Sequence, residues 1–420
     1  MAFNNTLAPA GPGYKALVFN KQVYITPEAA VKVLLFAQQG LPIFVLGTLP
    51  NITVGAVGQG IVSDAMSTVA QHSNVELLRD SESLSERLAA SGVRPRMSIV
   101  SGNNDLFSIW RSTDTADYVF LFNKGVGDVF KLRFAVSKDR VPYKLDAWTG
   151  EQSEVLVYNH DGDGLSISVF LSAEQTVVLA FEPSKATTRT HITSLSPNIE
   201  RVERDPSGGV GVLLKDSSGT TLTLSNGTEL TIGDSILRRS PLPSVLGPWN
   251  LTLESWVPGL NHSISQSAIE TVHLGMQSDL MPWSNMTQVR NASGVGIYTT
   301  TFSVAYDYLH NPLQEAVIIH FGPVLNTLRA WVNGRLLPPL DPANAETEIS
   351  GFLSPGINTI RAEVSSNLFN AVKARADWVR TLGQPVLFPG LYENAEFQPF
   401  GLIGPVTLRQ LRRAVVELDV

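Results

Sequence analysis

The sequence contains no cysteine. This absence excludes disulfide bonds, thiol catalysis and cysteine-ligated metal sites. Long apolar runs are missing too, since no stretch approaches the roughly 18 to 20 apolar residues that a membrane-spanning helix needs. Only 16% of the 420 residues are charged and 43% are hydrophobic, a composition typical of a globular chain and not of a disordered one. We therefore expect a folded protein with no membrane partner.

Clusters of positive charge are also scarce. The formal net charge is −7 and the pI is about 5.6. Phosphate backbones are bound by clustered Lys and Arg, whereas the basic runs here, Arg238-Arg239 and Arg412-Arg413, are short. These observations argue against nucleic acid as a partner.

The start of the chain lacks the basic and apolar regions of a cleavable signal peptide, which would suit a cytoplasmic protein if this start is the genuine one. N-glycosylation motifs instead hint at a secreted lineage. The seven motifs lie at Asn4, Asn51, Asn226, Asn250, Asn261, Asn285 and Asn291. The localisation stays open between these two interpretations.

A chain of this length predicts about two to four domains. Residues 1–96 read as a partial doubly wound α/β domain, because buried strands at Lys15–Phe19 and Pro42–Gly47 flank a predicted helix. Thr26 and Pro27 are suited to the N-cap and first turn of that helix. Further helix, strand and helix patterns continue the alternation.

After residue 96, apolar and polar residues alternate with a period of two, which predicts that the rest of the chain is mainly β. Residues 97–185 suit an antiparallel β-sandwich, and 186–240 a hairpin-rich connector in which Asn226-Gly227 favours a type I′ turn. After a proline-rich linker, 249–420 is expected to be a galactose-binding-like jelly roll. The segment Asn159–Gly164 resembles a calcium loop, but Leu165 breaks the EF-hand pattern, so a hairpin turn is the preferred interpretation.

No complete catalytic constellation is visible. The seven histidines lack metal-site spacing, and His320 alternates with core positions of a strand, as expected of a packed or capped histidine. Glycosidic cleavage normally needs two carboxyl groups about 5 to 9.5 Å apart. The acids considered for that role, each with a structural or exposed alternative, are Glu363, Glu393 and Glu396.

Aromatic residues concentrate in the last region, where a flat ring can meet the apolar face of a sugar and planar polar groups can pair with its hydroxyls. Each Trp also has a core alternative, and Asn333-Gly334 is also a good hairpin turn. The candidate carbohydrate-binding residues are Trp249, Trp256, Trp283, Tyr298, Trp331, Asn333, Arg335 and Trp378.

Seven motifs are specific enough to compare with known families: Tyr143–Glu151, Leu246–Trp249, Met281–Ser284, Ser293–Phe302, Trp331–Gly334, Leu337–Pro342 and Phe400–Val406. Together they resemble the carboxy-terminal, post-barrel region of α-L-rhamnosidase-like proteins of glycoside hydrolase family 106, the fungal type in particular. The opening α/β segment also fits an accessory domain of such enzymes.

The resemblance implies a catalytic barrel with an acidic pair and a calcium-dependent site in the family, but nothing in this chain matches that barrel. No catalytic residue can be carried over. The residues themselves indicate no cofactor, and calcium is implied by the resemblance alone. Enzymatic activity therefore stays open.

The leading hypothesis is a carbohydrate-active accessory protein that binds a glycan or a glycosylated small molecule. One alternative is a repurposed enzyme that uses an interdomain cleft in a fungal small-molecule pathway. A fragment with no independent role is the third interpretation. Substrate and oligomeric state cannot be read from these residues.

Overall fold

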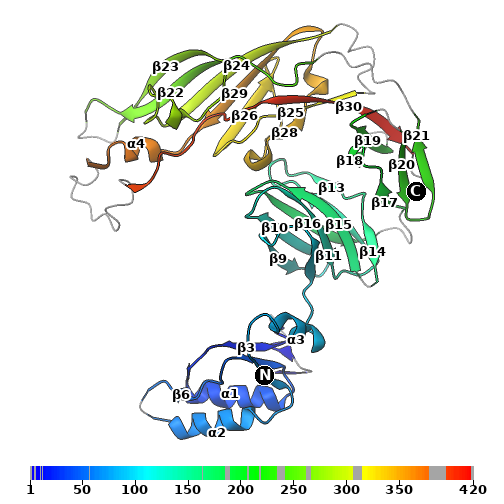
Figure 1. Ribbon diagram of the computed structural model, residues 1–420, viewed down its shortest axis with the longest axis vertical. Helices are drawn as coiled ribbons and strands as arrows, with labels where there is room; N and C mark the ends of the chain where they lie inside the picture. Colours follow the sequence, from blue (N-terminus) through cyan, green and yellow to red (C-terminus); the bar gives the residue numbers. More distant parts are fainter. Residues whose placement is uncertain are drawn as a thin grey trace. The chain divides into compact units, whose positions relative to one another are not determined.

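The structure is a computed structural model, which divides into two compact units, Met1–Arg96 and Met97–Val420. Figure 1 colours the chain from its amino to its carboxyl end. The residues that the structure describes are 2–3, 6–9, 11, 13–55, 57–162, 164–184, 190–205, 208–216, 219–233, 242–261, 266–305, 315–377 and 394–417.

The first unit is built on a parallel sheet of β3 (Leu17–Asn20), β5 (Ile43–Leu46) and β7 (Val75–Leu78). Successive side chains of β5 point to opposite faces of the sheet. Ile43 and Val45 pack with α1 (Pro27–Gln38) and α2 (Gln59–Val69) on one face. Phe44 and Leu46 contact Leu84 and Leu88 of α3 (Leu84–Ala90) on the other. Helices on both faces confirm the partial doubly wound arrangement.

Helix α1 begins where the Thr26-Pro27 pair predicted an N-cap followed by proline in the first turn. Thr26 is the N-cap, with its Oγ1 accepting a hydrogen bond from the Ala29 backbone nitrogen at 3.2 Å, and Pro27 occupies the first turn. The unit also has a short parallel pair, β4 (Tyr24–Ile25) with β6 (Ile52–Thr53), and a terminal pair, β1 (Ala2–Phe3) with β2 (Thr6–Leu7).

The second unit begins with an antiparallel β-sandwich, as predicted. Its interior is filled by side chains from both sheets, with Phe130, Phe134 and Phe181 fully enclosed. One sheet has the order β13 (Gln152–Glu154), β12 (Arg140–Leu145), β16 (Thr176–Pro183), β10 (Asp117–Asn123) and β9 (Leu106–Ser112). The other has the order β14 (Asn159–Asp161), β15 (Gly164–Leu171), β11 (Asp128–Phe134) and β8 (Met97–Ser101).

The segment that resembled a calcium loop is a hairpin turn, because Asp161 pairs with Gly164 across β14 and β15. A three-stranded sheet follows, with the order β17 (Ile192–Leu195), β20 (Thr220–Leu224) and β21 (Glu229–Ile232).

The hairpin between β20 and β21 is present, but its predicted type I′ turn is wrong. Gly227 donates its backbone N–H to Leu224 O at 2.9 Å, so the turn is centred one residue earlier. Gly227 has a φ of 86°, whereas Asn226 is not among the residues with positive φ, and a type I′ turn needs positive φ at both central positions.

A second sandwich ends the chain. Its larger sheet has the order β23 (Ser267–Gln277), β22 (Trp249–Pro258), β24 (Gly294–Val304), β29 (Gly356–Ser365), β26 (Thr327–Val332) and β27 (Arg335–Leu336). The facing sheet has the order β18 (Ile199–Arg204), β19 (Val210–Leu214), β30 (Thr407–Val416), β25 (Glu315–His320) and β28 (Glu346–Glu348). Their inner faces meet in one core, which includes Trp249, Tyr298, Phe321 and Leu402.

The second sheet of this sandwich takes two strands from the segment that was expected to be a connector. β30, near the end of the chain, lies between β19 and β25, with Leu213 opposite Arg413 and Ala316 opposite Leu411 (Figure 1). Strands β18, β19 and β30 therefore belong to one sheet, although β30 follows β19 by almost two hundred residues. Short helices complete the described elements: η1 (Trp283–Asn285), η3 (Pro342–Asn344), η4 (Ser350–Phe352) and α4 (Phe369–Lys373).

Candidate functional site

Three of the predicted sugar-binding aromatics lie in the interior of the final sandwich. Trp249 is 1% exposed, and Trp283 and Tyr298 are 0% exposed. Their polar atoms are satisfied inside the protein: Trp249 Nε1 donates to Leu246 O at 2.9 Å, and Trp283 Nε1 donates to Tyr298 Oη at 2.7 Å. The prediction that these rings bind a sugar is wrong, because a fully enclosed ring presents no face to a ligand.

Asn333 and Arg335 hold the hairpin between β26 and β27. Asn333 and Gly334 have φ values of 52° and 77°, and Val332 pairs with Arg335, which confirms a two-residue turn. Arg335 donates to Gly351 O at 2.7 Å, and its guanidinium lies 4.4 Å from the ring centre of Phe352.

The side-chain amide of Asn333 is committed to the same hairpin. Its Nδ2 donates to Phe352 O at 2.9 Å and to Asn358 Oδ1 at 2.7 Å. Its Oδ1 accepts from the Thr359 backbone nitrogen at 2.9 Å. Both amide hydrogens and the oxygen thus serve the turn, which is the structural alternative considered for this residue.

Trp331 is the predicted aromatic whose surroundings suit a ligand. It lies half-buried on the outer face of the larger sheet, between the inward-facing Ala330 and Val332. The guanidinium of Arg329 lies 5.2 Å from the centre of its ring, and that of Arg361 lies 5.3 Å away. Arg361 also forms an ion pair with Glu363. We call Arg329, Trp331, Arg361 and Glu363 the Trp331 cluster.

The register of the sheet explains how this cluster forms. Trp331 stands opposite Arg361, and Arg329 stands opposite Glu363, so that alternate residues of β26 and β29 share one face. Arg329 makes no ion pair with any residue in the described ranges. Sequence reasoning missed both arginines. Side chains two residues apart on a strand lie on the same face, so Arg329 could have been identified from its spacing to Trp331. Arg361 could not, because it lies on the neighbouring strand, whose identity the sequence does not reveal.

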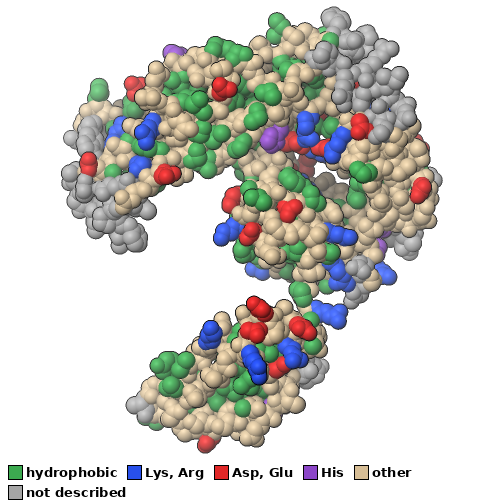
Figure 2. Space-filling model, in the orientation of Figure 1, with side chains coloured by type: hydrophobic (Ala, Val, Ile, Leu, Met, Phe, Trp, Pro, Cys, Tyr) green, Lys and Arg blue, Asp and Glu red, His purple; other side chains and the backbone are tan. Residues whose placement is uncertain are grey.

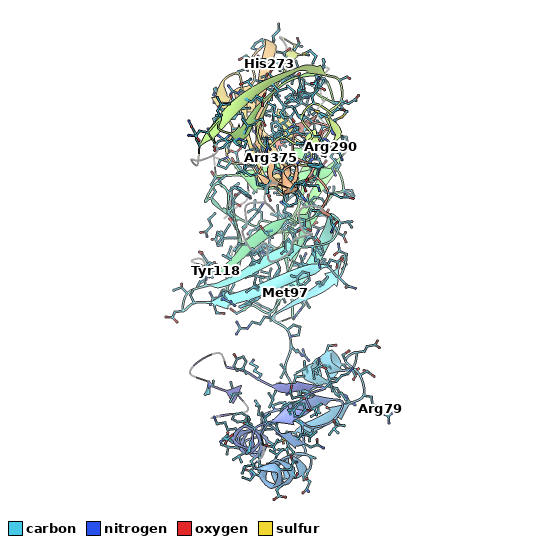
Figure 3. All side chains as sticks on the ribbon, turned by 90° about the vertical axis from the view of Figure 1, so that its left-hand side faces the viewer. Arg79, Met97, Tyr118, His273, Arg290 and Arg375 are labelled. Carbon is cyan, nitrogen blue, oxygen red and sulfur yellow. The ribbon has the colours of Figure 1, made fainter. Side chains whose placement is uncertain are left out.

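Polar residues continue across the same face. Beyond Glu363 the row runs through Ile297 of β24 to Thr252 of β22. Thr252 Oγ1 hydrogen-bonds His273 Nδ1 at 3.2 Å, and Figure 3 places His273 on this sheet. The row therefore joins the Trp331 cluster, through the apolar Ile297, to the polar pair of Thr252 and His273.

Trp256 occupies a different part of this face. Its side chain is 46% exposed and pairs across the strands with Ile269, which is 59% exposed. Trp256 is six residues along β22 from Asn250, which lies in the same cross-strand row as Trp331. At ~3.3 Å per residue, the cross-strand row that contains Trp256 lies about 20 Å from the row that contains Trp331. One monosaccharide cannot reach both rings.

Two of the predicted residues, Trp378 and Glu393, lie outside the described residues. Glu396 is exposed beside Phe397. Glu363 forms an ion pair with Arg361 on the outer face of the larger sheet.

The second sheet carries a separate ionic network that sequence reasoning missed. Arg409 binds both Glu200 and Glu346, and Arg201 also reaches Glu346 at 2.6 Å. The network continues through Lys215 with Glu200, and through Arg413 with Glu203 and Glu348. We call these residues the Arg409 network. Its members come from β18, β28, β30 and the residue after β19, so only the assembled sheet brings them together.

This network keeps its central carboxyl group ionised. Burial by itself would raise the pKa of Glu200, but the hydrogen bond and charge of Arg409, together with Lys215, hold that pKa below its usual value. Burial lowers the pKa of the neighbouring His320, against the opposing charge of Glu346. His320 Nδ1 accepts from the Gly322 backbone nitrogen at 3.2 Å, as expected of a capped histidine. A lowered carboxyl pKa is the opposite of what a general acid needs.

No metal centre can be assigned from the described part of the chain, where no three His, Cys, Asp or Glu side chains are placed to hold one ion. No helix in the described ranges is both long and apolar enough to span a membrane.

Comparisons with known proteins give a structural likeness and no sequence match. No protein-family model matches the chain, and neither does any curated protein. A rhamnosidase from Novosphingobium sp. PP1Y superposes over 96% of this chain and 34% of its own, with a TM-score of 0.55 and 18% identity.

Two further structures have lower scores. An exo-carrageenase from Bacteroides ovatus covers 41% of this chain and 23% of its own, with a TM-score of 0.27 and 12% identity. A β-D-glucuronidase from Dictyoglomus thermophilum covers 31% and 20%, with a TM-score of 0.21 and 16% identity. The likeness to the rhamnosidase shows the fold: this chain, which spans about a third of that protein's length, has the multidomain, mainly β architecture of part of a rhamnosidase.

Proposed function

We propose that this chain is a carbohydrate-binding, non-catalytic part of a rhamnosidase-like glycoside hydrolase of family 106, fungal type, and that the Trp331 cluster contacts the sugar. The fold likeness to a rhamnosidase over 96% of the chain supports the choice of carbohydrate as ligand. The observation that carries the site is the convergence of two guanidinium groups on one partly exposed indole, with one of the two also paired to the Glu363 carboxylate.

The chemistry of the cluster suits a sugar. The uncovered part of the Trp331 ring can meet the C–H face of a pyranose, which removes apolar surface of both from water. The guanidinium N–H groups of Arg329 can donate to the hydroxyls of the sugar ring. Glu363 can accept from those hydroxyls in addition to its bond with Arg361. Planar side chains with several hydrogen-bonding atoms fix the orientation of the ring.

The same contacts support a binding role in preference to a catalytic one. Glu363 is paired with Arg361, and Glu200 and Glu346 are paired with Arg409. For Glu200, the hydrogen bond and charge of Arg409 hold the pKa of the carboxyl group below its usual value in spite of burial. Hydrolysis of a glycoside needs one carboxyl group that stays protonated until it donates to the leaving oxygen. We therefore expect binding without turnover.

The test is calorimetric titration of the full chain with rhamnose-containing oligosaccharides, plant polysaccharides and a rhamnosylated small molecule. Trp331→Ala should weaken binding at least ~10-fold, because loss of a stacked aromatic contact typically costs more than ~1.4 kcal/mol. Trp256→Ala is the matched control, as it removes an exposed Trp from the same face about 20 Å away.

Three results would overturn the proposal. Absence of binding to every glycan would remove the carbohydrate role. A loss caused by Trp256→Ala and not by Trp331→Ala would place the site elsewhere. Release of rhamnose by the purified chain would contradict the non-catalytic assignment.

A further inference from the structure

The asparagines of the N-glycosylation motifs share one kind of environment. Six of the seven belong to the described residues, and all six are exposed. In contrast, Asn123, Asn358 and Asn370 lie outside the motifs, are buried, and donate from Nδ2 to backbone oxygens. The motif asparagines whose Nδ2 donates no hydrogen bond within the described part of the chain are Asn51, Asn226, Asn250, Asn285 and Asn291.

The motif of Asn250 lies inside a regular strand. Asn250 and Thr252 are two residues apart on β22, with the buried Leu251 between them, so both side chains point to the outer face of the larger sheet. The backbone of Asn250 is held on both sides, because it pairs with Met276 of β23 and Thr299 of β24. The sheet therefore fixes the direction in which a group attached to the Asn250 side chain leaves the backbone.

The register of the sheet aligns Asn250 with Trp331. One cross-strand row runs from Asn250 through Thr299 and Arg361 to Trp331. Neighbouring strands are ~4.8 Å apart, which separates Asn250 from Trp331 by about 14 Å. In the opposite direction, the row ends at Met276, because β23 is the edge strand of the described sheet. An oligosaccharide attached to Asn250 thus finds a continuous sheet surface in the direction of Trp331.

The side chains along this row suit an uncharged sugar. Thr299 is half-buried and offers a hydroxyl, and Arg361 offers N–H groups in addition to its ion pair with Glu363. The uncovered part of the Trp331 ring offers an apolar face. Figure 2 shows few Lys, Arg, Asp or Glu side chains over β22 and β23 on the visible side of the final sandwich. An attached glycan that lies along the row exchanges contacts with water for contacts with these side chains.

We propose that Asn250 carries an N-linked glycan, and that this glycan lies along the row and covers the Trp331 ring. The donor is a lipid-linked oligosaccharide pyrophosphate of a secretory compartment. The Nδ2 atom of Asn250 forms a bond to C1 of the first sugar, and the bond between C1 and the pyrophosphate oxygen breaks. The lipid pyrophosphate leaves with that electron pair, and the amide nitrogen loses one proton. The attached glycan restricts the Trp331 cluster to ligands that can displace it.

The first measurement asks whether Asn250 is modified. The chain is isolated from its natural source and treated with an amidase that cleaves the bond between asparagine and sugar, which converts each modified Asn to Asp. Peptide mass spectrometry should detect this conversion at Asn250. In a secretory host that glycosylates the unaltered chain, Thr252→Ala should lose the glycan and Thr252→Ser should keep it, because the motif accepts either hydroxyl residue. An unmodified Asn250 in the natural chain would overturn the proposal.

The second measurement asks whether the glycan covers Trp331. The two Thr252 variants are exposed to hydroxyl radicals, and the oxidation of each Trp is followed by peptide mass spectrometry. Trp331 should be oxidised at least about threefold faster in Thr252→Ala than in Thr252→Ser, because the bulky glycan no longer shields its ring. Trp148 is the control: it is 47% exposed, lies in the loop after β12 of the first sandwich, and should react equally in both variants.

The outcomes separate this inference from the proposed function. Equal oxidation of Trp331 in the two variants would overturn the covering of the ring. Faster oxidation of both Trp331 and Trp148 in Thr252→Ala would overturn it as well, since the change would then come from a loosened fold. Neither measurement uses an added glycan. This inference can therefore fail while calorimetry confirms the proposed function, and it can succeed while calorimetry finds no binding.

Discussion

The indole nitrogen of Trp283 donates to the phenol oxygen of Tyr298 across 2.7 Å in the interior of the final sandwich. The same oxygen accepts from the Leu402 backbone nitrogen at 3.2 Å. One hydroxyl therefore satisfies two buried donors, one from η1 and one from the segment that leads into β30. This arrangement links two parts of the chain that are more than a hundred residues apart.

Replacement of Tyr298 by Phe should destabilise the second unit by about 1–3 kcal/mol, because two buried N–H groups lose their acceptor. The measurement is urea unfolding followed by near-ultraviolet circular dichroism. Tyr118→Phe is the control, since no hydrogen bond from its hydroxyl is present in the described structure. Equal stability of the two variants would contradict the assigned role of the Tyr298 hydroxyl.

Gly401 is enclosed by the same pair of rings. A Cβ at this position would lie 2.8 Å from Trp283 Nε1 and 2.9 Å from Tyr298 Oη, and the φ of Gly401 is +118°. We expect Gly401→Ala to cost about 2–4 kcal/mol, from the forced repacking and the unfavourable backbone. Gly356→Ala isolates the backbone part, because Gly356 has a φ of +85° and nothing within 4 Å of its Cβ position. Thermal unfolding of the two variants should separate them clearly, and a similar loss in both would show that the rings can move aside.

Arg409→Gln should leave Glu200 paired with Lys215 and Glu346 paired with Arg201, within the part of the chain that the structure describes. The expected loss is about 1–3 kcal/mol, between the values for exposed and buried ion pairs, because these side chains are partly buried. Arg87→Gln is the control, since its pair with Glu76 is exposed and should contribute less than about 1 kcal/mol.

The Arg409 network also predicts a pH dependence. The pKa of Glu200 is lower in the folded chain than its ordinary value of 4.5. Its contribution to stability is therefore complete above pH 4.5 and is lost as the pH falls through the folded pKa. Chemical unfolding between pH 3 and pH 6 should show this decline in the unaltered chain and a shallower one in Arg409→Gln. Parallel curves for the two proteins would remove Glu200 as the source.

Asn333→Ala and Asn333→Gly test whether this residue serves the hairpin. Both variants lose the amide contacts to Phe352, Asn358 and Thr359, but only Ala also strains the backbone at a φ of 52°. We expect the Ala variant to be less stable than the Gly variant by about 1 kcal/mol. Glycan affinity measured on the folded variants should be unchanged, and a selective loss of affinity would return Asn333 to the binding site.

Features governed by neighbouring residues could be predicted from the sequence. Thr26 and Pro27 start α1 because a side-chain oxygen and a fixed φ act within one turn. Asn333-Gly334 forms its two-residue turn because both residues tolerate positive φ. The Asn226-Gly227 pair has the same composition but a different turn, because the register of β20 and β21 centres it one residue earlier.

Burial of the aromatic residues could not be predicted in this way. Trp249 and Trp256 lie on one strand, yet one fills the core and the other is 46% exposed, because alternate residues face opposite sides of the sheet. A Trp has both an apolar ring and a polar N–H, so it can lie in the core or at the surface. The sequence does not reveal that the N–H of Trp249 donates to Leu246 O and not to water.

The sequence by itself determined the start of α1, the Asn333-Gly334 turn, the α/β opening and the mainly β remainder, since periodicity and turn chemistry act over a few residues. Only the tertiary structure decided which strands are partners. It placed β18 and β19 beside β30, set Arg361 against Trp331, and brought Asn250 into the same cross-strand row. The physical reason is that strand pairing and burial depend on contacts between residues far apart in the chain, and the candidate sites consist of such contacts.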